Sequence, residues 1–509
     1  MKIRYHNNID KVVRIFNIAL ILGAILEVVI FPTFENVYGC LISGISWLLI
    51  WKFVFREKYL YYYVLPTLAV FGFGLCYCVL PLVITLTEGK PLTFNFEYPY
   101  ITFTNQLLNI LTIILAFRLC IHIYGQKDSI PRLWDKIGLF TPPTTKQLWI
   151  LGAIGVISVL YFAVTQTTET DEMREASGDM IGLLLNYLKP FAALPLCFLF
   201  PSLWNGNTVP KVKVLLFLLL VAVIGISTTR RSLVLEMFAS IFIIWFLLYL
   251  NKERTISGKV AIMLTIVFYL ITGPIADLAL AMSLNRHNIN GTNTFDAVIE
   301  LYQDKEAMHQ MQNAALMLTD NKGNNSLGWS EYYVDNIFLD RLCNIRVLDA
   351  SISYAETLGH STKEMRDYFH QYWINQLPSV VVDYLGEKKI VLYSPQDLMV
   401  SRRMNNDSLN YGWRVGGDTG IGLSLFGYWY YIYAFIVYFL LFYFFCSIVK
   451  VTSKGLMIPP PILAAMYSYF HYFDNGYGIF KATTLLARNG WQLVLFYCSI
   501  MFVLRFFKK

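Results

Sequence analysis

The chain has 509 residues, of which 56% are hydrophobic, 16% aromatic and only 15% charged, and its formal net charge is +7. This composition excludes a soluble globular surface, because such proteins carry roughly 25% charged residues. No basic stripe of the kind that binds nucleic acid is present, so no nucleic-acid partner is predicted.

Apolar runs of about 20 residues recur along most of the chain, and a helix of that length crosses a hydrocarbon layer of about 30 Å. These runs lack the alternating pattern of a β-barrel, which predicts an all-α polytopic membrane protein with about 12 transmembrane helices. The first run lacks a small-residue cleavage site and is predicted to be a retained span. The predicted spans are 15–33, 37–55, 61–86, 102–124, 148–166, 181–204, 212–227, 232–250, 260–283, 420–448, 456–473 and 484–507.

The distribution of basic residues predicts the orientation of these spans. The short connections on one face, together with both termini, hold 21 Lys and Arg residues, whereas the short connections on the other face hold 5. Because cytoplasmic connections are enriched in basic residues, both termini are predicted to be cytoplasmic. The membrane bundle is then formed by residues 1–283 (spans one to nine) and 420–509 (spans ten to twelve).

Residues 284–419 form one large segment on the extracytoplasmic, or periplasmic, side in this layout. The segment carries 12 Lys and Arg and 17 Asp and Glu residues, and it is long enough for a small domain. Apolar residues recur at helical spacing over 295–318 and 364–385, which predicts amphipathic helices packed over the mouth of the bundle.

Several ionisable residues within the spans fall in the extracytoplasmic half once this orientation is applied. They are Glu27, Lys189, Glu236, Asp277, His471 and Arg488, with Asp474 at the same boundary. Intramembrane charges are costly and usually face a cavity or a partner. A polar cavity that opens outward is one interpretation, and satisfied interhelical pairs, such as Lys189 with Glu236 or Asp277, are the other.

Two adjacent arginines, Arg230 and Arg231, lie on the face where basic residues are otherwise scarce. Guanidinium groups match phosphate oxygens in bidentate fashion, and Thr229 and Ser232 can cap the following helix so that its N–H groups point the same way. This turn is therefore a candidate diphosphate site. Contact between boundary arginines and lipid headgroups is the alternative interpretation.

A second constellation closes the large segment. It contains Arg402 and Arg403, then Trp413 and Arg414, and then Asp418 among glycines at 416, 417, 420 and 422. Glycines let backbone approach a ligand closely, and aromatic rings beside charged groups suit a sugar. Glycine-rich junctions between loop and helix are also common where nothing binds. No P-loop, dinucleotide fingerprint, H-E-x-x-H or paired-aspartate metal motif is visible, so neither a cofactor nor a metal site is predicted.

At these residues the chain resembles the oligosaccharide repeat-unit polymerases of bacterial surface polysaccharides, the O-antigen or Wzy-type polymerases. Thr228 to Ser232 matches the arginine turn of that family, although the glycine frequently found there is missing, which leaves open whether Arg230 or Arg231 is the functional residue. The stretch from Gly417 to Gly427 is similar to the family's re-entry into the membrane. The resemblance covers nearly the whole chain and rests on architecture as much as on motifs.

The resemblance implies a GT-C-like bundle in the bacterial inner membrane that polymerises polyprenyl-diphosphate-linked oligosaccharides during O-antigen, capsule or exopolysaccharide synthesis. A hydroxyl of one lipid-linked unit would attack the anomeric carbon of another with inversion, and arginines would stabilise the departing diphosphate without a metal. Lys189 is a further candidate for binding substrate. The resemblance also implies membrane lipids, a flippase and a chain-length regulator as partners.

Three other functions compete with this prediction. An O-antigen ligase uses the same donor and has a similar outer segment, and sequence discriminates poorly between the two. A flippase or solute transporter would also carry charges around a cavity, but transporters generally show an internal repeat and charges at the midplane. A membrane anchor that displays residues 284–419 would not need twelve spans.

The base that would accept the proton of the attacking hydroxyl must lie near the outer mouth and be free of a permanent cationic partner. His360 and His370 in the large segment and Asp418 at the glycine-rich junction meet these conditions. Glu236 ranks after them, because it lies about one turn from Arg231 or could serve Lys189. Solvent-exposed histidines without a role are the alternative for the first two.

Overall fold

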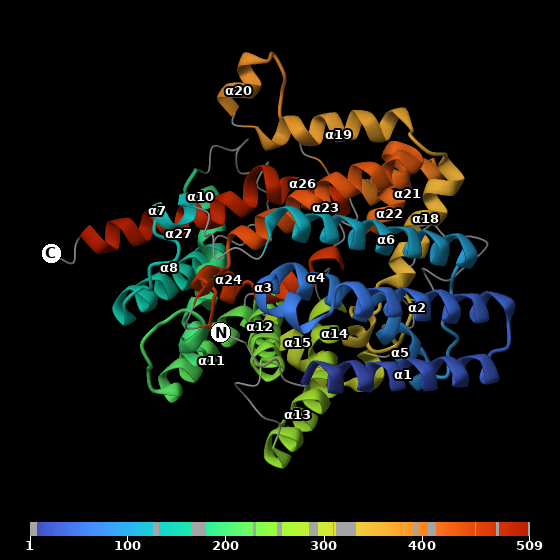
Figure 1. The fold of residues 1–509 in the computed structure, drawn as a ribbon, viewed down its shortest axis with the longest axis horizontal. Helices are drawn as coiled ribbons and strands as arrows, with labels where there is room; N and C mark the ends of the chain where they lie inside the picture. The colour runs from blue at the N-terminus through green and yellow to red at the C-terminus, as the bar shows by residue number, and fades with distance from the viewer. Residues whose placement is uncertain are drawn as a thin grey trace.

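The computed structural model describes residues 8–125, 132–164, 180–227, 231–251, 257–284, 294–308, 310–311, 332–377, 379–390, 392, 394–405, 414–452, 455–474 and 478–506. Within these ranges the chain is almost entirely helical (Figure 1). The strands that they contain are β1 (Lys450–Thr452) and β2 (Gly455–Met457), which pair antiparallel with Lys450 opposite Met457.

The described part of the chain contains seven helices that are long and apolar enough to cross a membrane. The chain is thus an all-α, membrane-embedded protein, while the count of twelve spans and the orientation stay predictions. The seven are Asn8–Ile30 (α1), Phe34–Phe53 (α2), Val64–Thr87 (α4, a π-helical turn and α5), Pro99–Tyr124 (α6), Thr145–Phe162 in α8, Asp418–Ser447 (α22 and α23) and Ile479–Phe506 (most of α26, a π-helical turn and α27).

Shorter apolar helices occupy Leu184–Leu199, Val234–Leu250 and Phe268–Met282. Exposed apolar side chains line many of the apolar helices, such as Ile18 and Val29 on α1, as expected for surfaces that face lipid. All eight cysteines are buried and free, including Cys343 in the large segment.

The complete helices have the following bounds. In the first half they are α3 (Glu57–Tyr62), α4 (Val64–Gly74), α5 (Leu80–Thr87), α7 (Arg132–Lys136), α8 (Thr145–Val164), α10 (Met180–Leu188), α11 (Lys211–Ser227), α12 (Arg231–Leu250), α13 (Gly258–Leu270) and α14 (Ala276–Leu284). In the second half they are α15 (Thr294–Gln303), α17 (Ile337–Asp340), α18 (Ile345–Leu358), α19 (Lys363–Gln376), α20 (Ser379–Tyr384), α21 (Pro395–Met404), α22 (Asp418–Phe426), α23 (Tyr430–Ser447), α24 (Pro460–Ala464), α25 (Met466–Phe470), α26 (Gly478–Thr484) and α27 (Gly490–Phe506).

The predicted span 181–204 is only partly α-helical. After α10 the chain continues as a 3-10 helix over Lys189–Leu199, followed by a short one over Pro201–Leu203. Pro190 and Pro195 lack the N–H groups that an α-helix needs at these positions. The tighter segment packs closely on α8, where a Cβ added to Gly155 would lie 1.9 Å from the backbone nitrogen of Ala192.

The predicted span 456–473 is wrong as a continuous helix. It forms two five-residue helices, α24 and α25, which are separated at Ala465. The break frees backbone groups that lipid could not satisfy, and Ser240 on α12 binds both sides of it. Its hydroxyl donates to the carbonyl of Ala464 (3.2 Å) and accepts from the N–H of Tyr467 (3.0 Å).

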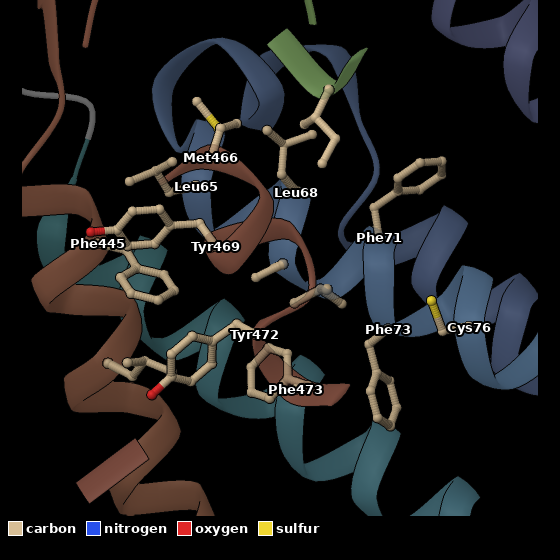
Figure 2. Close-up of a cluster of buried hydrophobic side chains, with 14 of the residues drawn as sticks. Leu65, Leu68, Phe71, Phe73, Cys76, Phe445, Met466, Tyr469, Tyr472 and Phe473 are labelled. Atoms are coloured by element: carbon tan, nitrogen blue, oxygen red, sulfur yellow. The ribbon is translucent and has the colours of Figure 1, made fainter. Parts of the chain in front are cut away.

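This broken segment lies in the middle of the hydrophobic core, between α4 and α23 (Figure 2). Tyr469 contacts the ring of Phe445 on α23 edge to face, with centroids 5.0 Å apart. On the other side, Phe470 contacts Phe71 of α4 at 6.3 Å. The approach to α4 is close enough that only glycine fits at position 72, since an added Cβ would lie 2.1 Å from the carbonyl oxygen of Phe470.

The predicted span 420–448 coincides with the apolar stretch Asp418–Ser447, but the chain folds back within it and does not form one straight helix. Gly427 adopts φ +60°, which ends α22, and α23 begins at Tyr430. A Cβ added to Gly422 would lie 2.1 Å from the ring of Tyr430, and the hydroxyl of Tyr438 reaches Asp418 at 3.1 Å. In one straight helix these last two residues would be about 30 Å apart, so α22 and α23 form a helical hairpin.

The large segment predicted to lie over the mouth contributes helices at one end of the bundle. Asp349 on α18 accepts hydrogen bonds from the N–H of Tyr98 (3.1 Å) and the hydroxyl of Thr102 (2.8 Å), at the start of α6. Figure 1 shows α18 and α21 at this end. Buried side chains of α18, α19 and α21 belong to the same hydrophobic cluster as those of the apolar helices.

The two helices expected within this segment are shorter than predicted. The first, expected over 295–318, is α15 and ends at Gln303, and residues 312–331 lie outside the described ranges. The second, expected over 364–385, is divided into α19 and α20 at Leu377, because the following proline, Pro378, disfavours helical backbone at the residue before it.

The contact between Gly72 and Phe470 makes a stability prediction. Gly72→Ala should lower the unfolding free energy by about 1–3 kcal/mol through overpacking. Gly44→Ala in α2 is the matched control, because its added Cβ would meet Leu20 at an ordinary 3.8 Å. Thermal denaturation of the two detergent-solubilised variants, followed by size-exclusion chromatography, measures the difference. Equal melting temperatures would contradict the packing described for α4 and α25.

Candidate functional site

The glycines of the 416–422 stretch serve helix packing in this structure. A Cβ added to Gly420 would lie 2.3 Å from the backbone of Ser351, and one added to Gly417 would lie 2.8 Å from the Cα of Leu348. The predicted close approach of backbone at these glycines is therefore found, but its partner is α18. The hydroxyl of Ser351 accepts from the N–H of Gly417 (2.6 Å) and donates to Gln396 (2.9 Å).

This packing fixes Asp418, the first residue of α22, inside the bundle. Its side chain is buried, and Oδ2 accepts a hydrogen bond from Tyr438, whose hydroxyl lies 3.3 Å from that of Tyr430. The other oxygen, Oδ1, is buried and accepts no hydrogen bond from the described residues. A buried carboxylate oxygen without a donor is costly, so this position is under a functional or electrostatic constraint.

Lys481 on α26 brings two of the predicted site residues together. Its charge interacts with the carboxylate of Asp418 and with that of Glu236 on α12. The Nζ atom lies 5.7 Å from the ring centroid of Tyr472, whose hydroxyl donates to the backbone carbonyl of Lys481 at 3.3 Å. Elements separated by about 240 residues thus come within electrostatic range of one cation.

Glu236 is the solvent-accessible carboxylate of this cluster. It also interacts with the charge of His471, whose ring stacks on Tyr467 at 5.2 Å. Residues four apart share one face of a helix, and Ser240 on that face is buried against α24 and α25. Phe238 and Phe242 are exposed on another face. Glu236 is exposed and lies near the face of α12 that carries Ser240.

Two of the predicted substrate-binding arginines are engaged in ion pairs. Arg414 donates to Asp397 at 2.8 Å, and the carboxylate of Asp397 is completely buried in the capping box that begins α21. Arg403 donates to Glu97 at 3.0 Å and to Ser353 at 2.9 Å. Its guanidinium also lies 4.3 Å from the ring centroid of Tyr354. Both arginines join the large segment to itself or to the start of α6.

The pKa of Glu97 reflects this pairing. Burial raises the pKa of Glu97, but the hydrogen bond from Ser353 and the charge of Arg403 outweigh that effect and hold the pKa below its usual range. The adjacent Asp349 is fully buried and accepts hydrogen bonds from four donors, among them Arg346 at 2.9 Å. These interactions tie α18 and α21 to the N-terminal end of α6.

The remaining predicted residues lie apart from the cluster or outside the described ranges. His360 contacts Glu356 at 3.0 Å and Gly427, at the opposite end of α22 from Asp418. His370 on α19 and Arg402 on α21 are exposed. Lys189 donates to Asn186 and lies over the ring of Phe162.

The arginine turn is largely outside the described structure. Arg230 and Trp413 lie outside the described residues, and only the backbone of Arg231, the first residue of α12, is described. The chain places Glu236 about one and a half turns along the same helix from Arg231, or roughly 7.5 Å at 1.5 Å per residue.

Sequence reasoning missed Lys481 and Tyr438. Lys481 counted only as one basic residue in an outer connection, although an isolated lysine on the face with few basic residues was a signal of the same kind as the arginine turn. Tyr438 is one of many tyrosines in α23, and no sequence pattern distinguishes it. Among the described residues, no group of three or more His, Cys, Asp or Glu side chains could hold a metal ion.

Comparisons of the chain with protein-family models, with curated proteins and with solved structures find no match.

The ion pair between Arg414 and Asp397 makes a prediction that separates structural from substrate-binding arginines. Arg414→Ala leaves the fully buried Asp397 carboxylate unpaired, which should cost about 3–5 kcal/mol of stability. Arg402→Ala, at an exposed position in the same segment, should leave the melting temperature unchanged. Thermal denaturation of both variants measures this. If Arg414→Ala unfolds at the wild-type temperature, the ion pair does not hold the entry to α22.

Proposed function

We propose that this protein is a membrane glycosyltransferase that polymerises polyprenyl-diphosphate-linked oligosaccharide units on the extracytoplasmic side of a bacterial inner membrane. The observation that carries the proposal is the cluster of Glu236, Asp418 and Lys481 inside a helical membrane bundle. The cluster contains an exposed carboxylate, a buried carboxylate and a cation. Asp418 belongs to one of the motifs on which the resemblance to the polymerases rests, and Glu236 lies close to the other, the arginine turn.

In the proposed reaction Glu236 is the general base. The hydroxyl oxygen of the acceptor forms a bond to the anomeric carbon of the donor, the bond from that carbon to the diphosphate oxygen breaks, and the lipid diphosphate leaves with the electron pair. The proton of the hydroxyl passes to the carboxylate of Glu236. A base must touch the acceptor, and the accessible side chain of Glu236 meets this requirement better than the buried Asp418.

Lys481 and Asp418 act as positioning residues in this proposal. In this proposal the charge of Lys481 orients the carboxylate of Glu236 toward the acceptor hydroxyl. Asp418 holds Lys481 by charge, and α18 holds Asp418 through the packing of Gly417 and Gly420. The departing diphosphate would be stabilised by Arg230 and Arg231, which precede Glu236 in the sequence, as in other phosphate sites in which arginines bind in bidentate fashion.

A second candidate function, transport of a lipid-linked oligosaccharide or another solute, is favoured by one observation. Two elements in the bundle are discontinuous, namely the hairpin of α22 and α23 and the broken pair of α24 and α25. Discontinuous helices that carry charged residues commonly form substrate and ion sites in transporters. An O-antigen ligase remains the alternative within glycosyl transfer.

The fate of lipid-linked glycans in a deletion strain distinguishes these functions. Loss of a polymerase leaves single repeat units that an impermeant reagent labels in spheroplasts, whereas loss of a transporter leaves units that this reagent does not reach. Long unligated chains would indicate a ligase.

The assignment of the base predicts that Glu236→Gln lowers polymer formation by two orders of magnitude or more, since general bases contribute about 10²–10⁴ to rate. His360→Ala and His370→Ala should retain wild-type chain lengths and serve as controls. Polymer length is read from gels of surface glycan after expression of each variant is verified. Full activity of Glu236→Gln together with loss of activity in a histidine variant would move the base to the large segment.

The arginine turn predicts a separate outcome. Alanine at Arg230 or Arg231 should leave short glycans for at least one position, because losing a charge-assisted contact to the leaving group costs orders of magnitude in rate. The Lys211→Ala variant, which removes a basic residue from the predicted cytoplasmic face, is the control. Normal polymer length in both single variants and in the double variant would exclude the turn as the diphosphate site.

A further inference from the structure

Exposed apolar side chains in the large segment are concentrated at one place. Among the described side chains between residues 332 and 405, the exposed large hydrophobic residues are Val381, Tyr384, Leu385 and Ile390, together with Met404 at the threshold of exposure. Tyr384 is 90% exposed. By contrast, the exposed positions of α19, which precedes them, are polar or charged, among them Lys363, Glu364 and Asp367. We call residues 381–390 the apolar tip. In Figure 1, α20 projects beyond α19, away from the rest of the bundle.

The tip is a built structure that holds these side chains outward. Backbone hydrogen bonds close the end of α20, from the N–H of Leu385 to the carbonyl of Val381 (3.0 Å) and from that of Glu387 to Val382 (3.1 Å). The following strand-like stretch is tied back to α19, where Asn375 donates to the carbonyl of Ile390 at 2.7 Å and Gln371 donates to that of Lys388 at 2.7 Å. Apolar side chains held out in this way need a nonaqueous partner.

The position of α19 places the tip near the end of the membrane-spanning helices. Tyr372 on α19 bonds to the hydroxyl of Thr484 and donates to the carbonyl of Phe480 at 3.3 Å. These residues lie near the start of Ile479–Phe506, a helix of 28 residues. Such a helix is about 42 Å long and exceeds the hydrocarbon thickness of about 30 Å, so it is long enough for its first turns to extend past the hydrocarbon layer.

Exposed aromatic residues mark the same level. Phe369 on α19 contacts Phe426 and Tyr433, with ring centroids 5.6 and 6.3 Å apart. The turn between those two residues carries Trp429, which is 74% exposed, and Tyr428. Exposed tryptophan and tyrosine at the end of an apolar helix are typical of the interface between lipid and water. The helix that carries the tip therefore packs at the level of the interface.

From these observations we propose that the apolar tip inserts into the lipid–water interface of the bilayer that the spans cross, as a second, monotopic contact of the large segment with the membrane. Tyr384, Leu385 and Ile390 would enter the boundary between headgroups and acyl chains, and Lys388 would extend to the phosphates. The tip has no net charge, because it carries two acidic and two basic residues, namely Asp383, Glu387, Lys388 and Lys389. Insertion therefore depends on apolar burial and needs no anionic lipid. This contact is independent of the reaction proposed above.

Fluorescence quenching on the full chain tests the proposal. Tyr384→Cys is labelled with an environment-sensitive fluorophore in phosphatidylcholine nanodiscs, and Glu364→Cys at the other end of α19 is the matched control. The eight native cysteines are buried, so wild-type protein measures background labelling. We expect nitroxide lipids to quench the label at 384 at least threefold more than the label at 364, and aqueous iodide to do the reverse. Both variants must elute as wild-type protein does.

Two results would overturn the proposal. In the first, iodide quenches the label at 384 as strongly as the label at 364, and nitroxide lipids have no effect, which shows that the tip stays in water. In the second, the label at 384 is protected from both quenchers, which shows that a protein surface, either another copy of the chain or a different partner, covers the tip.

Discussion

The requirement that every backbone N–H and carbonyl in the bundle finds a partner within the protein governs this structure. Lipid offers no hydrogen bonds, so helices dominate, and each interruption of a helix needs a specific side chain. Ser240 satisfies both sides of the break between α24 and α25. Ser351 accepts from the N–H that begins α22, and Asp349 accepts from two N–H groups at the start of α6. These three side chains allow the chain to depart from continuous helices, and the candidate site is built from those departures.

The same requirement explains which parts of the fold could be predicted from sequence. Long apolar runs such as Asn8–Ile30 and Pro99–Tyr124 form helices close to the predicted spans, because their own backbone bonds satisfy them. The predicted spans that differ from the structure are those in which groups from distant parts of the sequence form hydrogen bonds with the backbone. Ser240 precedes the break at Ala465 by more than 200 positions, and no local pattern around residues 456–473 announces it. The fold-back at Gly427 lies inside an apolar run whose composition is that of a single helix.

Only part of the candidate site could be predicted from the sequence, because a residue type does not show which partner it contacts. Glu236 stood out because charges are rare in apolar runs, and Asp418 stood out because it lies at the glycine-rich junction. Lys481 was overlooked because its neighbours resemble a loop. The glycines of the 416–422 stretch were correctly associated with a close approach of backbone, yet glycine does not say what approaches, and here the partner is α18. Arg403 and Arg414 likewise carried a signal for an anion that their own chain supplies, through Glu97 and Asp397.

The charges of Glu236, Asp418 and Lys481 limit where the diphosphate could bind relative to the proposed base. Two carboxylates, those of Glu236 and Asp418, interact with the single cation of Lys481, so an anionic diphosphate brought among them would meet repulsion from each carboxylate in its ionised form. The acceptor hydroxyl is neutral and meets none. A polymerase built on this bundle would therefore have to bind the diphosphate away from the carboxylates. Arg231, the first residue of α12, precedes Glu236 by five positions on that helix, so the proposed diphosphate site and the proposed base would be separated along α12. Inverting transfer has the same requirement, because the base and the leaving group must face the anomeric carbon from opposite sides.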